Sequence, residues 1–415
     1  MNDSQQIDIP SRLGRWWTDR APSGEFWALV VAAFLFNFGV SVFFFLYNLL
    51  MLDLGFRERS LGVLASALAF GSMAGTIPMG LAARRFGLKR VLMVCLVLLA
   101  AGFVARVFLF WYPAQLTFAF FDGVVLCGWV VALSPAVANV VEERKRPFAF
   151  SVLFAVAVAT GSLGGFVGGN MPGWCHRLGT RFAGVAVSGV DAKRLTLLLA
   201  CLLTGMAAWP IQHLRGGAAS ESVRWGKRPS PFLLRFLLAS ALWAAVVGAF
   251  NPFTNVFFSR YLGVPTAHLG NFFSIAQLVQ AAAVLTMPFV LRRTGLISGI
   301  MAAQLTAGGM IALLAVSHGV LHAEVLYCGF MAAQHMCDPG LQSLLMDRIE
   351  ADERSGASAL YFLAISVAQA VSAAVAGAAY SRFSYPPVLL AVGGATVIAA
   401  GLFRLLCGSH ESKAM

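Results

Sequence analysis

Long runs of uncharged, apolar residues dominate the chain and predict membrane-spanning helices. No charged residue lies between Glu25 and Asp53, and none lies between Arg59 and Arg84. A helix needs about 20 apolar residues to cross a bilayer, so each run is long enough for one span. The runs lack the alternation of barrel strands. The pattern predicts twelve helices, near residues 26–50, 60–82, 90–112, 115–141, 147–170, 194–214, 232–257, 268–291, 296–317, 323–346, 355–381 and 386–407.

Three polar segments lie outside these helices and divide the chain. Residues 1–25 form an N-terminal segment, residues 408–415 form a short tail, and residues 215–231 form a polar linker. The linker separates two groups of six helices, an N-terminal half over residues 26–214 and a C-terminal half over residues 232–407. The predicted fold class is therefore an all-α integral membrane protein with twelve transmembrane helices in two halves. The largest remaining loop is predicted over residues 171–193.

Composition and charge support this prediction and add an orientation. The chain is 59% hydrophobic and 12% charged, whereas a soluble domain is about a quarter charged. The net charge of +12 could indicate nucleic-acid binding, but the basic residues concentrate in alternate loops, as the positive-inside rule describes. We therefore expect both termini in the cytoplasm and no binding to nucleic acid. We also expect a monomeric, multi-pass protein in a bacterial-type cytoplasmic (inner) membrane, with the lipid bilayer as a partner. The basic residues of the inner loops include Arg84, Arg85, Lys89, Arg90, Arg144, Lys145, Arg146, Arg215, Arg224, Lys227, Arg228, Arg292 and Arg293.

Sequence motifs for enzymes, metals and cofactors do not occur. The seven cysteines are scattered without a Cys-x-x-Cys pair, six of them within predicted spans and Cys175 in a predicted loop. The chain also has no Gly-rich phosphate loop, no His-Glu-x-x-His and no Gly-x-Ser-x-Gly. We therefore expect neither an ATP-driven pump nor an enzyme, and neither a metal nor a cofactor.

The two halves share short matches at one sequence offset. Arg84, Arg85 and Gly87 correspond to Arg292, Arg293 and Gly295, which lie 208 residues further on (292 − 84 = 208). Leu54-Gly55 and Leu61-Gly62 match Leu262-Gly263 and Leu269-Gly270 at the same offset, and Arg146 matches Arg354. Six helices per repeat give both repeats the same orientation, which predicts halves related by an axis along the membrane normal.

The loop between the second and third helices resembles the motif of the major facilitator superfamily, and the resemblance extends over essentially the whole chain. The family motif is Gly-x-x-x-Asp-Arg/Lys-x-Gly-x-Arg/Lys-Arg/Lys. Here its acidic position holds Arg84. The resemblance implies a transporter whose cytoplasmic gate is linked by charges, and the gate would need another acid, Glu142 or Glu143. A positive-inside loop without a gating role is the alternative. The residues are Gly80-Leu-Ala-Ala-Arg84-Arg85-Phe-Gly87-Leu-Lys89-Arg90, and the predicted gating set is Gly80, Arg84, Arg85, Gly87, Arg90, Glu143, Arg292, Arg293 and Gly295.

The fifth predicted helix carries a glycine pattern over residues 161–169. It is similar to the family's antiporter motif, which ends Gly-Pro-x-x-Gly-Gly, with Gly165 in place of the proline. The resemblance implies export, but small residues four apart also allow close helix packing. The arginine that drug–proton antiporters carry in the fourth helix is absent, which disfavours a typical drug antiporter.

Polar residues on the tenth predicted helix form the principal candidate site. Gln334, His335, Asp338 and Gln342 share one helical face, and His335 and Asp338 lie near mid-membrane. In the family that the chain resembles, helices 1, 4, 7 and 10 line the central cavity. A carboxylate and an imidazole three residues apart can share a proton or bind a cationic substrate. The alternative is a buried hydrogen-bonded pair between helices.

Further polar groups lie in the first, third, fourth, seventh and eighth helices. Arg106 and Asp122 are predicted at similar depth on antiparallel helices, either as a structural ion pair or with Asp122 as a substrate or proton site. Amide side chains on the remaining helices could bind substrate or join helices. The predicted substrate- and proton-binding set is Asp338, His335, Gln334, Asn37, Asp122, Asn251, Asn255 and Gln277.

The sequence thus predicts a secondary active transporter of a small organic solute. It would work by alternating access, coupled to protons, with efflux by antiport preferred and an uptake symporter or facilitator as the alternative. A second class remains open, because a scaffold does not fix function: a non-transporting membrane sensor or a lipid-moving protein with the same fold.

Overall fold

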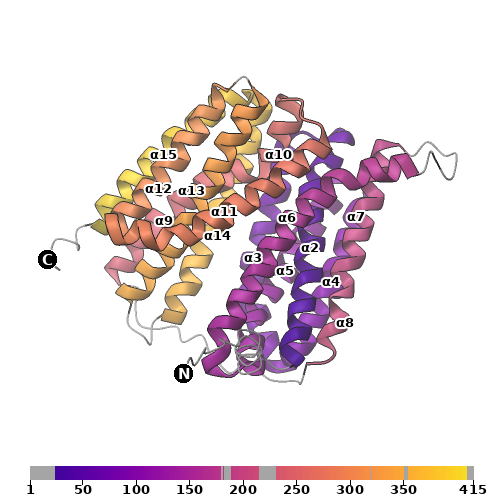
Figure 1. The fold of residues 1–415 in the computed structure, drawn as a ribbon, viewed down its shortest axis with the longest axis horizontal. Helices are drawn as coiled ribbons and strands as arrows, with labels where there is room; N and C mark the ends of the chain where they lie inside the picture. The colour runs from indigo at the N-terminus through magenta and orange to yellow at the C-terminus, as the bar shows by residue number, and fades with distance from the viewer. Residues whose placement is uncertain are drawn as a thin grey trace, which may run out of the picture.

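The computed structural model describes residues 24–178, 181, 188–214, 230–317, 319–349 and 354–408. These residues form twelve long helical stretches, joined by short connections, and the described part contains no strand (Figure 1). The stretches are α2 (Gly24–Asp53), α3 (Glu58–Phe86), α4 (Leu88–Phe108), α5 (Tyr112–Val140), α6 (Arg146–Leu178), α7 (Gly189–Met206) with α8 (Ala208–Ile211), α9 (Pro231–Phe250) with η3 (Asn251–Phe253), α10 (Thr254–Val256) and η4 (Phe257–Tyr261), α11 (Thr266–Thr294), α12 (Leu296–Ala315), α13 (Val320–Arg348), α14 (Arg354–Arg382) and α15 (Tyr385–Cys407), and a short turn, η1 (Glu143–Lys145), precedes α6.

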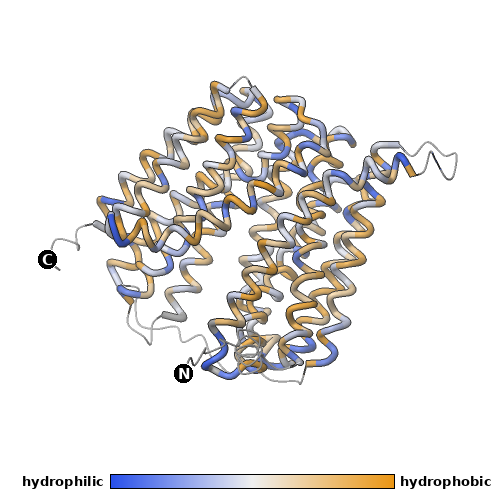
Figure 2. The backbone as a smooth tube through the Cα atoms, viewed as in Figure 1, coloured by the Kyte–Doolittle hydropathy of each residue, from blue (hydrophilic) through white to orange (hydrophobic). Residues whose placement is uncertain are grey.

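The helices have the length and the surface of membrane spans. Within the described residues, eleven stretches are long and apolar enough to cross a bilayer. Figure 2 shows apolar residues along the helices and hydrophilic ones concentrated near their ends. The twelfth stretch, α13, has 29 residues and is long enough. It is less apolar because it carries Glu324, Gln334, His335 and Asp338, so the helix with the most polar sequence is also the one that holds the principal candidate site.

The 208-residue repeat predicted from sequence is confirmed by the helix boundaries. Helices α3 and α11 begin 208 residues apart and end 208 residues apart (266 − 58 and 294 − 86). The same holds for α5 and α13 (320 − 112 and 348 − 140). We call α2–α8 the N-terminal half and α9–α15 the C-terminal half, and Figure 1 shows them as two helical bundles.

The tight turns repeat as well. Among the described glycines, those with positive φ form two pairs at the same offset, Gly55 with Gly263 and Gly87 with Gly295. Gly87 (φ 85°) is the one residue between α3 and α4, and Gly295 (φ 81°) is its counterpart between α11 and α12. A side chain at such a φ would be strained, which explains the glycine at both predicted turns.

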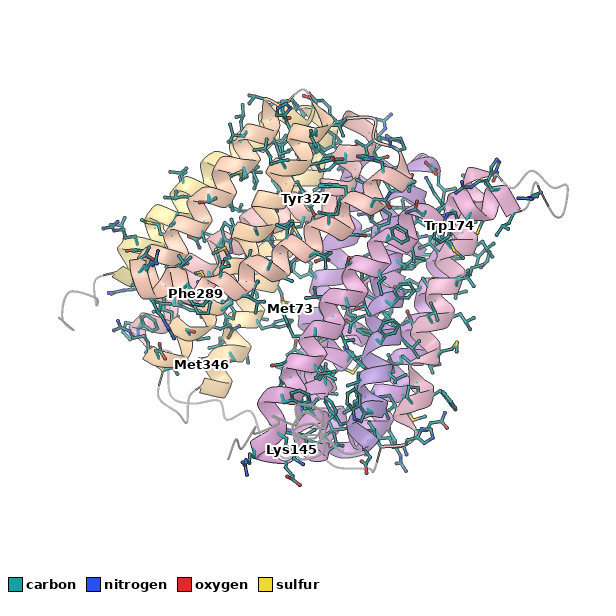
Figure 3. All side chains as sticks on the ribbon, in the orientation of Figure 1. Met73, Lys145, Trp174, Phe289, Tyr327 and Met346 are labelled. Carbon is teal, nitrogen blue, oxygen red and sulfur yellow. The ribbon has the colours of Figure 1, made fainter. Side chains whose placement is uncertain are left out.

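The halves pack against each other mainly through two pairs of helices at one end of the molecule. These pairs are α3 with α14 and α6 with α11, and the offset of 208 relates one pair to the other. We call the end that carries Arg84, Arg85, Arg292 and Arg293 the basic end, which Lys145 marks in Figure 3. The cross-half contacts lie at the opposite end, where the bundles approach each other in Figure 1.

Small residues allow the helices to approach closely at these contacts. We call the α3–α14 and α6–α11 contacts together the seal. A Cβ on Gly270 would lie 2.5 Å from the Gly165 carbonyl oxygen and 2.6 Å from the Gly169 Cα. A Cβ on Gly62 would lie 2.5 Å from the Ala373 carbonyl oxygen and 3.0 Å from the Gly377 Cα. The three positions correspond at the 208 offset: Gly62 to Gly270, Gly165 to Ala373 and Gly169 to Gly377.

Serine hydroxyls complete the seal in both copies. Ser274 Oγ donates to the Ser162 carbonyl (2.6 Å), and its counterpart Ser66 Oγ donates to the Ala370 carbonyl (2.5 Å). Ser162 Oγ in turn donates to the Ser274 carbonyl (3.1 Å). A serine hydroxyl can reach a carbonyl of the neighbouring helix only where both helices present small residues. The glycines of α6, predicted either as tight packing or as an antiporter motif, do pack tightly.

Two details differ from the sequence prediction. Helix α6 continues to Leu178 and α7 begins at Gly189, so much of the predicted loop 171–193 is helical. Cys175 accordingly lies in α6, not in a loop. The apolar run alone marks the membrane-crossing part of a helix and misses polar turns that extend beyond it. Most of segment 1–25, most of linker 215–231 and the tail beyond residue 408 lie outside the described residues.

Candidate functional site

A cavity of about 540 Å³ lies between the two halves. Helices α2, α3, α4 and α6 of the N-terminal half line it, and the broken α9–α10 segment, α11 and α13 of the C-terminal half line the other side. Tyr327 of α13 is one of the lining residues and is labelled in Figure 3. A cavity of this size at the interface between repeats is where transporters with repeated halves hold their substrates.

The two walls of the cavity differ in polarity. The N-terminal wall is mostly apolar, with Leu61, Leu64 and Leu68 of α3 and the aromatic rings of α2. The C-terminal wall is polar. Its amide, hydroxyl and imidazole groups belong to Asn251, Thr254, Asn255, Gln277, Gln280, Tyr327 and His335. Hydrogen bonding to a ligand is therefore concentrated on the C-terminal half, and ring stacking is available from the N-terminal half.

Two asparagines tie the cavity wall to the opposite half. Asn48 Nδ2 donates to the Pro252 carbonyl (3.0 Å), and Asn255 Nδ2 donates to the Phe45 carbonyl (3.0 Å). The partners are carbonyls, so the amide nitrogens must be the donors, and the two amide oxygens remain to accept. Pro252 lies within the 3₁₀ turn η3, directly after the end of α9, and because proline has no backbone N–H it leaves a main-chain carbonyl free at this depth.

Helix α13 presents a stripe of three residues to the cavity. Tyr327, Met331 and His335 are spaced by four residues, which puts them on one face. His335 Nδ1 lies 3.0 Å from the Met331 carbonyl oxygen. A carbonyl oxygen only accepts, so Nδ1 carries the proton in this contact and Nε2 is left for the cavity. The predicted His335 is thus placed at the cavity wall.

Asp338 and Gln334 lie next to this stripe but do not line the cavity. Asp338 is exposed one turn closer to the basic end, and Gln342 beyond it is exposed too. Within the described residues no hydrogen bond or ion pair joins Asp338 to His335, so the predicted sharing of a proton is not present in this conformation. Gln334 is buried, and its Oε1 has no partner in the described part of the chain.

Arg106 and Asp122 form an ion pair inside the N-terminal half, as their predicted depths suggested. Arg106 Nη1 lies 3.2 Å from Asp122 Oδ2, and both side chains are almost fully buried. The Arg106 guanidinium also stands over the Tyr47 ring, 4.2 Å from its centroid. Arg106 and Tyr47 reach the cavity wall, whereas Asp122 lies behind it.

Gln115 holds this ion pair in place. It is fully buried, accepts from the Tyr47 hydroxyl at Oε1 (2.6 Å), and donates from Nε2 to the carbonyls of Arg106 (2.7 Å) and Leu109 (2.5 Å). The amide therefore links α2, α4 and α5 next to the buried charges.

Replacing Gln115 by alanine is expected to destabilise the protein. Gln115→Ala leaves one hydroxyl and two carbonyls without their partner, and each unsatisfied buried group costs about 1–3 kcal/mol. The matched control is Tyr47→Phe, which removes only one of these bonds. The unfolding temperature of both variants in detergent would measure the loss of stability. An equal decrease in the two variants would contradict the linking role of Gln115.

Several residues lie elsewhere than predicted or were not predicted. Asn37 donates to the Ala33 carbonyl of its own helix (2.8 Å) and does not line the cavity. Asn251, Asn255 and Gln277 do line it. Tyr327 and Met331 were absent from the predicted set, although their spacing of four from His335 was a usable signal.

The predicted gating residues lie at the basic end, where the described residues form no ion pair between the halves. Arg84, Arg85, Arg90, Arg292 and Arg293 are exposed. Among the ion pairs of the described residues, the one at this end joins Lys145 to Glu142 within one connection (3.8 Å), and none there crosses between halves. Gly80 lies within α3, and the Glu143 side chain is outside the described part. The structure thus places this set at an end where the halves are apart.

The described residues contain no group of three or more His, Cys, Asp or Glu side chains that could hold a metal ion. The polar groups that line the cavity are amides, hydroxyls, one imidazole and the guanidinium of Arg106. Such a wall can orient a small solute by hydrogen bonds and stacking.

Solved structures with the same fold are transporters. A nucleoside transporter, NupG (D323A mutant), is 15% identical, with a TM-score of 0.78 over 92% of this chain and 100% of that one. A bacterial homolog of the human lysosomal transporter Spinster is 14% identical, with a TM-score of 0.76 over 94% and 97%. A D-xylose–proton symporter is 15% identical, with a TM-score of 0.70 over 91% and 96%. Comparison with curated proteins gives no match.

At the level of sequence, the family model of the Major Facilitator Superfamily matches residues 29–350. This range runs from α2 to the end of α13 and covers more than half of the chain. Together with the helical repeat and the cavity between the halves, it gives a firm assignment: the chain belongs to the Major Facilitator Superfamily.

Proposed function

We propose that this protein is a proton-coupled secondary transporter that moves a small organic solute through the central cavity by alternating access. The observation that carries the proposal is the cavity itself, closed by the seal at one end and lined by hydrogen-bonding side chains of the C-terminal half. A substrate site at the interface of two repeats, with one end closed, is the arrangement that alternating access requires.

The positive-inside rule gives the proposed orientation. The exposed arginines at the basic end would face the cytoplasm, so both termini would be cytoplasmic. The conformation would then be open to the inside and sealed to the outside. In support, the solved Spinster homolog of similar fold is described as inward-facing.

The size and polarity of the cavity favour a small polar solute. A volume of about 540 Å³ lies within the range of small-molecule sites. Two similar structures are a nucleoside transporter and a D-xylose–proton symporter, and both transport small polar molecules. The polar wall argues against a lipid-moving protein, which needs an apolar path, and a sensor would need no cavity between the halves.

Coupling to protons is proposed for Asp338 and His335 on α13. His335 reaches the cavity, and Asp338 lies one turn closer to the basic end, exposed and without an ion-pair partner in the described residues. A proton could pass between the basic end and the cavity along this face. The glycines of α6 pack the seal, so they favour neither export nor uptake.

The substitution Asp338→Asn tests the coupling. It removes the carboxylate but keeps the size of the side chain, so pH-gradient-driven transport should fall at least about tenfold while insertion and solute exchange without a gradient persist. The assay screens solutes in proteoliposomes with and without a pH gradient. The control is Asp347→Asn, an exposed carboxylate at the end of the same helix. Unchanged gradient-driven transport in Asp338→Asn would refute its role.

A further inference from the structure

Arg106 is a buried cation at the wall of the cavity whose hydrogen bonds are incomplete. It is 3% exposed, yet it is among the residues that line the cavity. A guanidinium has five N–H donors. Nη1 bonds Asp122 at 3.2 Å, while Nε is buried and has no partner among the described residues. A buried donor left without an acceptor calls for a partner that is missing, and the cavity is where that partner can come from.

The surroundings of Arg106 favour an anionic partner. Among the described residues, no acidic side chain lines the cavity, and the titratable groups there are Arg106, His335 and two tyrosines, Tyr47 and Tyr327. Asp122 balances the charge of Arg106 from behind the wall. The Tyr47 ring, 4.2 Å from the guanidinium carbon, fixes the plane of the guanidinium, and the Gln115 bond to the Tyr47 hydroxyl fixes the ring. The cation is therefore positioned before a ligand arrives.

We propose that Arg106 binds a carboxylate group of the transported solute, and that this happens when Asp122 takes up a proton. Resting on the proposed function, this inference names the substrate class, an organic monocarboxylate. The proton that enters along the face of Asp338 and His335 adds to an Asp122 oxygen and converts the carboxylate to the neutral acid, which releases Arg106. The solute carboxylate then takes the place of the Asp122 carboxylate beside the guanidinium, so the charge of Arg106 is balanced before the proton arrives and again once the solute is bound.

The charge balance also selects the ligand and the direction of coupling. One carboxylate replaces another of equal charge, and one proton accompanies it. A phosphate dianion would leave one charge uncompensated in the interior, which is costly. Because the proton favours binding of the solute, proton and solute cross together, and the transporter works as a symporter.

The remaining groups of the cavity suit the rest of such a solute. Phe44 and Phe45 on the apolar wall can stack a ring or cover an alkyl chain, while Gln277 and Gln280 on the other wall can bond neutral polar groups. The carboxylate and the ring or alkyl chain would thus face the N-terminal half, with the neutral polar groups of the solute against the C-terminal half. Both halves hold one molecule, as alternating access requires.

Matched solute panels in proteoliposomes test the proposal. One panel contains small organic monocarboxylates, and the other contains the corresponding neutral amides. Counterflow without a pH gradient measures binding and exchange, and uptake with an inward proton gradient measures coupling. The variants are Asp122→Asn, which imitates the protonated acid and keeps Arg106 charged, and the double variant Arg106→Gln with Asp122→Asn, which leaves no buried unpaired charge. The control is Arg194→Gln, in an exposed ion pair with Asp191 outside the cavity.

The expected result is counterflow of acids but not of their amides. Asp122→Asn should keep counterflow of the acid and lose stimulation by the proton gradient at least tenfold. The double variant should lose acid counterflow, and Arg194→Gln should behave as wild type. Transport of amides without transport of acids would overturn the carboxylate site and leave the proposed transporter intact. Acid counterflow in the double variant would overturn the role of Arg106. Failure of both panels would contradict this substrate class, and failure of every solute in the wider screen would refute transport itself.

Discussion

Joining Ser162→Cys to Ser274→Cys with a disulfide is expected to stop transport. The hydroxyl of each serine donates to the carbonyl of the other, so the two side chains cross the seal between α6 and α11. A covalent link there keeps the halves joined at the sealed end, which is the end opposite the basic end. Alternating access requires the sealed end to open. Transport should fall at least about tenfold on oxidation and return on reduction. The measurement is solute uptake by proteoliposomes before and after treatment with oxidant and then reductant.

The repeat supplies an independent copy of this experiment. Ser66→Cys with Ala370→Cys occupies the corresponding positions, because 274 − 66 and 370 − 162 both equal 208. It should have the same effect. The background should lack Cys175 and Cys328, the native cysteines that are not buried. Each single substitution serves as a control, and full activity of an oxidised, cross-linked double variant would show that this end does not open during transport.

The helices and the repeat could be predicted from sequence because each has a local cause. A span follows from a run of apolar residues, and its partner in the repeat follows from matches at one offset, such as Arg84-Arg85 with Arg292-Arg293. Gly87 and Gly295 match at this offset in loops between predicted helices, and both have positive φ. The pairing of Arg106 with Asp122 followed from equal depth on antiparallel helices, and the ion pair confirms it.

The cavity residues were harder to predict because depth and helix tilt decide which side chains meet. Asn37 and Asn48 lie 11 residues apart on α2, which is about three turns and leaves them within about 20° of the same face. Along the helix they are separated by about 16 Å. Asn48 reaches the Pro252 carbonyl where α9 is broken, whereas Asn37 bonds only within its own helix. Sequence periodicity indicates the face but not the neighbour.

The cross-half packing depends on residues that carry no chemical signal of their own. Gly165 and Gly169 were read as an antiporter motif or as packing, and their partner, Gly270, lies more than a hundred residues further on. Only the fold brings the three together. The repeat then shows that Ala373, Gly377 and Gly62 form the same contact. The seal is therefore present in both repeats, whereas the polar wall of the cavity belongs to the C-terminal half alone.

A side chain at Gly270 is expected to prevent the seal from forming. In Gly270→Val the new Cβ would meet the Gly165 carbonyl oxygen at 2.5 Å and the Gly169 Cα at 2.6 Å. These are backbone atoms, which cannot move away by a change of rotamer. Helices α6 and α11 must therefore separate, and the end opposite the basic end stays open. Each half keeps its own packing, so the protein should still insert and fold, but transport should fall at least about tenfold because only one of the two states remains accessible.

Opening of the seal can be measured apart from transport. Ser66→Cys, buried in the other copy of the seal, should react slowly with a membrane-impermeant maleimide in the background that lacks Cys175 and Cys328, and at least about tenfold faster when combined with Gly270→Val. The control is Gly309→Val in α12, where a Cβ meets no atom within 4 Å and labelling should not change. Since Ser66 does not touch Gly270, faster labelling there would report separation of the halves. Slow labelling together with lost transport would instead show that the substitution acts by a different route.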